Sequence, residues 1–193
     1  MLDGSETTFP VVCLGASAGG LQSYIRLFHE LPVDVGLAVV VINHMRHSRS
    51  LIAELLTRRT PMPVQVISER MPPRLNHVYV PPNCDLTLLD SAFHLSPLSK
   101  PRGWPNVITI FLESLAQEWK GQAVAVILSG MGSDGVEALK VIKEAGGITF
   151  AQKIETAEYP EMPRSAIDSG FVDLVLSPES IAHELIRIGH VGG

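Results

Sequence analysis

Residues 11–20 read VVCLGASAGG, an apolar run that passes directly into a glycine-rich turn. The run over residues 11–15 is apolar on both faces, which is typical of a parallel strand covered by helices on each side. Residues 21–31 follow with a helical period that ends before Pro32. A strand, a tight turn and a helix in this order predict the first unit of an α/β fold.

The same alternation of strand and helix recurs along the chain. We predict further strands over residues 37–42, 64–67, 123–128, 148–151 and 172–176, and further helices over residues 51–59, 107–119, 136–145, 164–168 and 178–188. Between Met71 and Pro101, the shorter runs 78–80, 86–89 and 93–95 are separated by turn residues. They predict a small antiparallel insertion of hairpins. We therefore expect residues 1–193 to form one α/β domain with a doubly wound, mostly parallel sheet and helices on both faces.

The composition is that of an ordinary globular protein. Hydrophobic residues make up 46% of the 193 residues and charged residues 18%, which argues against a disordered chain. The net charge of −5 and the lack of a dense Lys/Arg run argue against nucleic acid as a partner. No apolar stretch is long enough to insert into a membrane, and the first residues carry no secretory signal, so we expect a cytoplasmic protein.

The sequence also predicts neither a metal nor an organic cofactor. Cys13 lies inside the first apolar run, where a buried free thiol is the expected state. His44 and His47 are three residues apart but have no cluster of cysteines or carboxylates around them, and the other histidines are scattered.

The turn after the first strand, residues 15–20, reads G-x-S-x-G with Ser17 at its centre. In this setting the pattern is typical of a nucleophile elbow, which lifts a serine hydroxyl above the sheet at the start of a helix. Glycine-rich turns also bind phosphates, but the spacing is not G-x-G-x-x-G and no acidic residue ends the second strand. A nucleotide loop and a purely structural turn remain the alternatives from the motif alone.

Two further residues favour the hydrolase interpretation. In a sheet of order 3-2-1-4-5, the loops that follow strands 1, 2 and 4 meet at one edge, where such folds bind ligands. Ser17 follows the first predicted strand, His44 the second, and Asp134 the strand 123–128. We predict that the Ser17 hydroxyl lies within hydrogen-bond reach of one His44 ring nitrogen and that Asp134 binds the other. Taken alone, His44 is explained as a polar surface residue. Asp134 alone is explained as the N-cap of the helix that follows it.

Several stretches together resemble the catalytic domain of the chemotaxis receptor protein-glutamate methylesterases, the CheB family. They run in the family's order across nearly the whole chain: residues 15–20, Asn43-His44-Met45, residues 76–82, residues 127–135 and residues 162–167. The resemblance implies a serine hydrolase that removes methyl esters from receptor glutamates, releases methanol and deamidates certain receptor glutamines. It implies Ser17 as nucleophile, His44 as general base, Asp134 as the orienting carboxylate and the backbone N–H of Met131 as an oxyanion donor.

The resemblance also implies partners, and the chain departs from the family pattern in places. Methylated chemoreceptor helices are the implied substrate, with a receptor methyltransferase or a receiver domain as further partners. At Ala18 some members carry a hydroxyl, so only the backbone N–H is available there as a second oxyanion donor. Residues 1–10 offer only Asp3 and Glu6 as acidic groups. We therefore expect no receiver domain in them and no phosphodonor-dependent activation.

Three alternatives stay open at this point: a hydrolase of another ester, thioester or amide, a non-catalytic regulatory or scaffolding domain of the same fold, and a dinucleotide-binding domain. Residues 100–105 replace a more polar stretch of the family, so the family's substrate contacts are not expected there. Ala18 and the stretch Glu158-Tyr159-Pro160 resemble the corresponding residues of family domains that are fused to a receptor methyltransferase.

Overall fold

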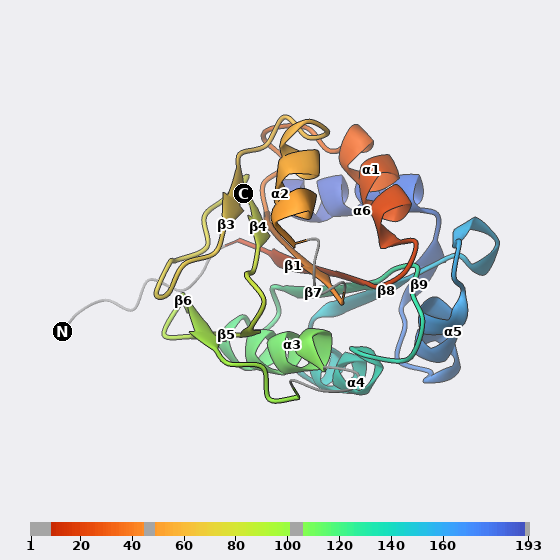
Figure 1. Cartoon of the computed structure of the whole chain (residues 1–193). Coiled ribbons are helices and arrows are strands. Elements are labelled where there is room, and N and C mark those ends of the chain that lie inside the picture. The colour runs from red at the N-terminus through yellow and green to blue at the C-terminus, as the bar shows by residue number, and fades with distance from the viewer. Residues whose placement is uncertain (1–8, 45–48, 101–105, 192–193) are drawn as a thin grey trace.

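The computed structural model describes residues 9–44, 49–100 and 106–191, which are arranged around a seven-stranded sheet (Figure 1). The strands of this sheet are β1 (Val11–Ala16), β2 (Ala38–Asn43), β3 (Val64–Val66), β4 (Val78–Val80), β7 (Ala123–Ile127), β8 (Ile148–Gln152) and β9 (Leu174–Leu176). A separate hairpin is formed by β5 (Asp85–Leu89) and β6 (Ala92–Ser96). The helices are α1 (Gly20–Glu30), α2 (Arg49–Thr57), α3 (Val107–Glu118), α4 (Val136–Glu144), α5 (Glu161–Asp168), α6 (Pro178–Val191) and the 3₁₀ helix η1 (Ile154–Thr156).

The sheet has the order β3-β4-β2-β1-β7-β8-β9, and all of its strand pairs are parallel. The doubly wound α/β fold predicted from the sequence is therefore confirmed. So is the central position of β1 between β2 and β7, on which the meeting of the three loops depended. The described helices include none that is both long and apolar enough to cross a membrane.

One part of the predicted architecture is wrong. Residues 78–80 belong to the main sheet as β4, between β2 and β3, and not to the antiparallel insertion, which holds only the β5–β6 hairpin. In the predicted order 3-2-1-4-5 the strands 37–42 and 64–67 are neighbours, whereas in the structure β4 lies between β2 and β3. A strand of three residues carries no usable period, and residues 67–77 join β3 to β4 without a helix. The burial of β4 on both faces explains its place inside the sheet.

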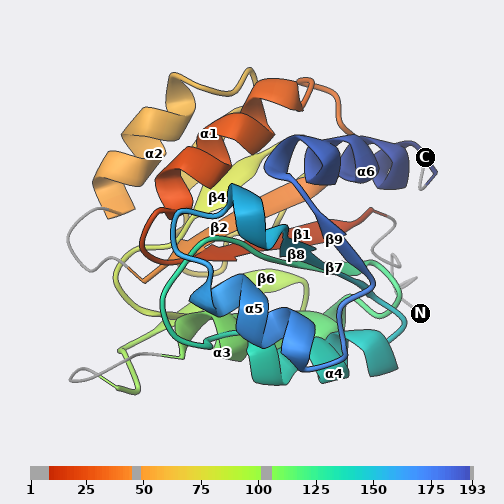
Figure 2. The ribbon, with the colours of Figure 1, turned by 90° about the vertical axis from the view of Figure 1, so that its right-hand side faces the viewer.

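The helices form one layer on each face of the sheet, as Figure 2 shows. Helices α1, α2 and α6 cover one face, the α1 face, and α3, α4 and α5 cover the other, the α3 face. Alternate residues of β1 point to opposite faces, so that Val12 and Leu14 join the α1 core while Val11 and Cys13 join the α3 core. Cys13 is a buried free thiol, as predicted. Burial, with a smaller effect of the Asp134 charge, raises the pKa of that thiol far above its usual value, which keeps it unreactive.

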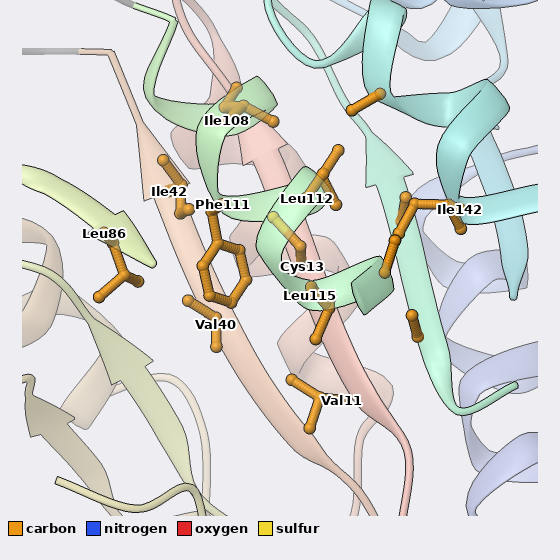
Figure 3. Close-up of a cluster of buried hydrophobic side chains, with 14 of the residues drawn as sticks. Val11, Cys13, Val40, Ile42, Leu86, Ile108, Phe111, Leu112, Leu115 and Ile142 are labelled. Carbon is orange, nitrogen blue, oxygen red and sulfur yellow. The ribbon is translucent and has the colours of Figure 1, made fainter. Parts of the chain in front are cut away.

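Helix α3 is the element that links the core to the edge of the sheet. Figure 3 shows the Phe111 ring between α3 and the β2 residues Val40 and Ile42, with Leu86 of the hairpin beside it. Phe93 of the hairpin also packs against Phe111, with ring centroids 6.5 Å apart. Because these side chains have no exposed surface or almost none, they fix where the first turn of α3 lies.

Replacing Phe111 with alanine should test this role. We expect Phe111→Ala to lower the free energy of unfolding by about 3–5 kcal/mol, through lost burial and a residual cavity. Urea denaturation followed by circular dichroism measures the change. The control Val33→Ala removes a valine that is 51% exposed, and it should shift the free energy by less than about 0.5 kcal/mol. Equal losses in the two variants would contradict the proposed packing.

Candidate active site

Three loops meet where β1, β2 and β7 end. The register pairs Ala16 with Asn43 and Gly15 with Ile127, so the residues after these strands emerge at the same edge. The Ser17 turn (residues 16–20) and the Gly130 loop (residues 128–135) are joined by a hydrogen bond of 3.1 Å from the Ser17 N–H to the Ser129 carbonyl. The His44 N–H donates to the Ala16 carbonyl at 3.2 Å. Ser17, His44 and Asp134 therefore lie on converging loops, as the sequence indicated.

His44 and Asp134 form a buried pair. The His44 Nε2 atom is hydrogen-bonded to Asp134 Oδ2, and the two side chains are only 5% and 4% exposed. The prediction that Asp134 binds one ring nitrogen of His44 is confirmed in this respect. Because an ionised carboxylate can only accept in this hydrogen bond, it places the hydrogen of a neutral imidazole on Nε2 and leaves the lone pair on Nδ1.

The Asp134 carboxylate is saturated by hydrogen-bond donors. Its Oδ1 accepts from the Thr109 N–H at 2.9 Å and from the Thr109 hydroxyl at 2.8 Å. Its Oδ2 accepts from the Ile108 N–H at 2.9 Å in addition to His44. These two N–H groups belong to the first turn of α3, where they have no partner within the helix. The Thr109 oxygen in turn accepts from the Gly135 N–H at 2.8 Å.

The alternative that Asp134 caps the helix that follows it is wrong. Helix α4 begins after Gly135, whose φ of 88° lies in the left-handed region, and receives no side-chain cap. The carboxylate instead caps α3, which is distant in sequence. This arrangement explains the electrostatics: burial raises the pKa of Asp134, but the hydrogen bonds from His44, Ile108 and Thr109 outweigh it and leave the pKa below its usual value. Asp134 is therefore an anion at neutral pH.

A backbone hydrogen bond joins His44 to the Ser17 turn, but the Ser17 side chain makes no hydrogen bond to the His44–Asp134 pair. Ser17 is 6% exposed, and neither it nor the buried Nδ1 atom of His44 has a side-chain hydrogen bond to any described residue. The predicted hydrogen bond between Ser17 and His44 is thus not formed in this structure. Catalytic hydrogen bonds are often long or unformed without substrate and close in the complex. Of the two ring nitrogens of His44, Nδ1, which bears the lone pair, is the one with no partner among the described residues.

Glycines allow the loops to approach Ser17 closely. Gly19 has a φ of 72°, and a Cβ atom there would lie 2.7 Å from the Ser129 hydroxyl oxygen. A Cβ atom on Gly130 would lie 2.9 Å from the Ser17 Cβ. Both contacts are too short for real side chains, so only glycine fits at these two positions.

The backbone supplies unpaired donors beside Ser17. Within the described part of the chain, the N–H groups of Ala18 and Met131 donate to no acceptor. Ala18 directly follows Ser17 and precedes α1, whereas Met131 lies on the Gly130 loop and is 42% exposed. N–H groups in such positions can bind the negative oxygen of a tetrahedral intermediate. Among the residues that the structure describes, no group of His, Cys, Asp and Glu is suited to hold a metal ion.

Sequence reasoning missed three polar residues that support the site: Thr109, Ser129 and Gln152. Thr109 and Ser129 bind groups more than 20 residues away, so no local pattern marks them. Gln152 ends the apolar strand β8 at the same edge of the sheet. A polar residue after a buried strand is the signal that had identified His44, and it could have identified Gln152 as well.

Comparisons with known proteins agree with one another. A family model described as CheB methylesterase matches residues 12–185. A protein-glutamate methylesterase/protein-glutamine glutaminase of Burkholderia pseudomallei is 32% identical over 182 residues, which are 93% of this chain and 53% of that protein. A relative from Leptospira interrogans, provisionally named for the same two activities, is 32% identical over 93% of this chain and 95% of its own. The crystal structure of the Thermotoga maritima CheB methylesterase catalytic domain matches with a TM-score of 0.87 and 28% identity, over 93% of this chain and 98% of that one.

These relatives differ in length. The chain spans about half the length of the Burkholderia relative and of a Mesorhizobium japonicum relative with the same name, which is 31% identical over 53% of its length.

The lowered pKa of Asp134 predicts how stability depends on pH. A carboxylate with a lowered pKa in the folded state stabilises fully above its unfolded pKa of about 3.9, and this stabilisation is lost as the pH falls through the folded-state value. We expect Asp134→Asn to be less stable than wild type at pH 5 by about 1–3 kcal/mol, since Asn cannot accept from every donor. The difference should shrink at pH 3.

Urea denaturation of both proteins at pH 5 and pH 3 measures that difference. Asp34→Asn, which changes an exposed carboxylate, serves as the control and should match wild type at both pH values. A gap between wild type and Asp134→Asn that stays constant or widens at pH 3 would contradict the prediction.

Proposed function

The chain belongs to the CheB methylesterase family, and we propose that it is a protein-glutamate methylesterase that hydrolyses glutamyl methyl esters on chemoreceptors. The observation that carries the proposal is the buried His44–Asp134 pair at the edge of the sheet where the Ser17 turn emerges, with the Nδ1 atom of His44 left without a partner. In this proposal Ser17 is the nucleophile, His44 the general base and Asp134 the carboxylate that orients the imidazole.

The first half of the reaction forms an acyl-enzyme. As the Ser17 oxygen attacks the ester carbonyl carbon, Nδ1 of His44 accepts the hydroxyl proton, and Asp134 stabilises the resulting imidazolium. The carbonyl oxygen becomes an oxyanion, and in this proposal the N–H groups of Ala18 and Met131 bind it. The carbon–oxygen bond to the methoxy group then breaks, and the imidazolium returns the proton, so that methanol leaves.

The second half reverses these roles with water. Nδ1 takes a proton from water, the hydroxide attacks the acyl carbon, and the proton returns to Ser17 as the bond to the serine oxygen breaks and the receptor's glutamate side chain leaves as a carboxylate. A glutamine side chain would react by the same steps with ammonia as the leaving group. The relatives' names, which join methylesterase to glutaminase, support this second reaction.

The proposed substrate also suggests partners. Methylated helices of chemoreceptors would present their glutamyl esters to the Ser17 turn, and we expect the reaction to take place in the cytoplasm. A receptor methyltransferase, which makes the ester, and a receiver domain are further proposed partners. The extra length of the Burkholderia and Mesorhizobium relatives leaves room for such a domain in those proteins.

Mutant kinetics test the triad. We expect Ser17→Ala and His44→Ala each to lower kcat by about 10³–10⁶-fold, and the double variant to lose little more because the residues act as a unit. The measurement is the release of methanol from receptor membranes that carry isotopically labelled methyl esters. Ser96→Ala and His183→Ala change an exposed serine at the end of β6 and an exposed histidine that pairs with Glu30, at the opposite end of α1 from the Ser17 turn, and both should keep wild-type rates.

Two results would exclude these assignments. Methanol release by Ser17→Ala at the wild-type rate would remove Ser17 as the nucleophile. Losses that multiply in the Ser17→Ala/His44→Ala variant would show that the two residues act independently.

A further inference from the structure

Gln152 ends β8 with a side chain that is wholly buried, at 0% exposure. Its Oε1 atom accepts from the Ser129 N–H at 2.9 Å and from the Ser23 hydroxyl at 2.8 Å. Its Nε2 atom donates to the Thr156 carbonyl at 2.9 Å and to the Thr156 hydroxyl oxygen at 3.2 Å. Two donors and two acceptors therefore saturate the amide and fix its orientation.

The two groups that donate to Oε1 come from two segments that are both joined to Ser17. Ser23 lies near the start of α1, the helix that begins directly after the Ser17 turn. Ser129 begins the Gly130 loop, and its carbonyl accepts from the Ser17 N–H. The Gln152 oxygen thus joins α1 to the Gly130 loop.

The unpaired N–H group of Ala18 lies on the Ser17 turn directly before α1, and that of Met131 lies on the Gly130 loop. Two donors bind an oxyanion well only if they are held at a fixed spacing before the reaction. Ser129 adds to the connection, because its hydroxyl donates to the Ala18 carbonyl at 3.1 Å and accepts from the Tyr159 N–H at 3.0 Å. The Oε1 atom of Gln152 therefore binds both α1, which follows Ala18, and Ser129, which begins the loop that carries Met131.

Gln152 is itself held firmly on its other side. The Thr156 carbonyl that accepts from its amide also accepts from Arg26 Nη1 at 3.3 Å. Arg26 pairs with both carboxylate oxygens of Glu179, at 2.6 and 2.9 Å. Contacts from α1, α6 and the 3₁₀ helix η1 therefore hold the Gln152 amide in place. The amide in turn can hold the Ser17 turn and the Gly130 loop.

We infer that Gln152 is a positioning residue of the proposed hydrolase, whose side-chain carbonyl sets the spacing between the Ala18 and Met131 oxyanion donors. The inference rests on the proposed function. Gln152 touches no reacting atom. Loss of the amide leaves the buried Ser129 N–H without an acceptor, which lowers stability, so activity is compared per folded enzyme.

The variant Gln152→Met keeps the length of the side chain and removes all four hydrogen bonds. We expect kcat per folded enzyme to fall by about 10- to 100-fold, as a displacement of about 1 Å produces, with KM within about twofold. Thr149→Val is the matched control, since Thr149 is also 0% exposed on β8, but its hydroxyl binds Phe171 and Asp173, away from Ser17. Its kcat should stay within about twofold of wild type.

Ser23→Ala keeps the inference testable if Gln152→Met does not fold. It removes one of the two donors to Oε1 and should lower kcat by about 3- to 10-fold, and the double variant should lose no more than Gln152→Met alone. The inference is overturned if Gln152→Met and Ser23→Ala keep kcat within about twofold of wild type, or if Thr149→Val loses as much as they do.

A fluorophosphonate probe separates this inference from the proposed function. The probe forms a tetrahedral adduct with a reactive serine whatever the natural substrate is, and its rate should fall in Gln152→Met and Ser23→Ala but not in Thr149→Val. If wild type is labelled at Ser17 but releases no methanol from methylated receptor, the proposed substrate is wrong and the labelling rates still decide the role of Gln152. A wild type with no labelled serine would overturn both.

Discussion

The carboxylate of Asp134 is the group around which the site is assembled. It binds two backbone N–H groups at the start of α3, the Thr109 hydroxyl and His44 at once. A buried carboxylate with fewer partners would bind a proton or destabilise the fold, whereas this one stays charged because its donors outweigh burial. The same contacts cap a helix and hold the imidazole, so stability and chemistry depend on one group.

That dependence reaches into the hydrophobic core. The two N–H groups can meet Asp134 only if the first turn of α3 lies over the carboxyl end of β1, and Phe111 and Leu112 on that helix are packed without exposed surface. Close-packed side chains transmit small displacements, so an altered core under α3 would move the donors of Asp134 and then His44. The position of the imidazole is thus a consequence of packing that lies several residues away from it.

The sequence allowed the general fold and the placement of Ser17, His44 and Asp134 to be predicted, because buried parallel strands are apolar runs and their ends mark one edge. It did not allow the assignment of β4, whose three residues lack a period and follow a connection without a helix. It also missed Thr109 and Gln152, since their partners are set by tertiary packing. The expected bond from Ser17 to His44 depends on how closely two loops approach each other, which no sequence pattern determines.

Saturated and unsaturated polar groups together distinguish this site from ordinary buried polarity. The side chains of Asp134 and Gln152 use all of their hydrogen-bonding positions. The Nδ1 atom of His44 is instead buried without a partner, which costs about 1–3 kcal/mol of stability for such a group. Within the described residues Asp85 Oδ1 is buried without a partner as well, so an unsatisfied atom alone identifies no site. What differs is the surroundings: Nδ1 belongs to a ring held by a saturated carboxylate and lies on a loop beside the Ser17 turn. A proton acceptor left free among rigid neighbours is the arrangement that general-base chemistry requires.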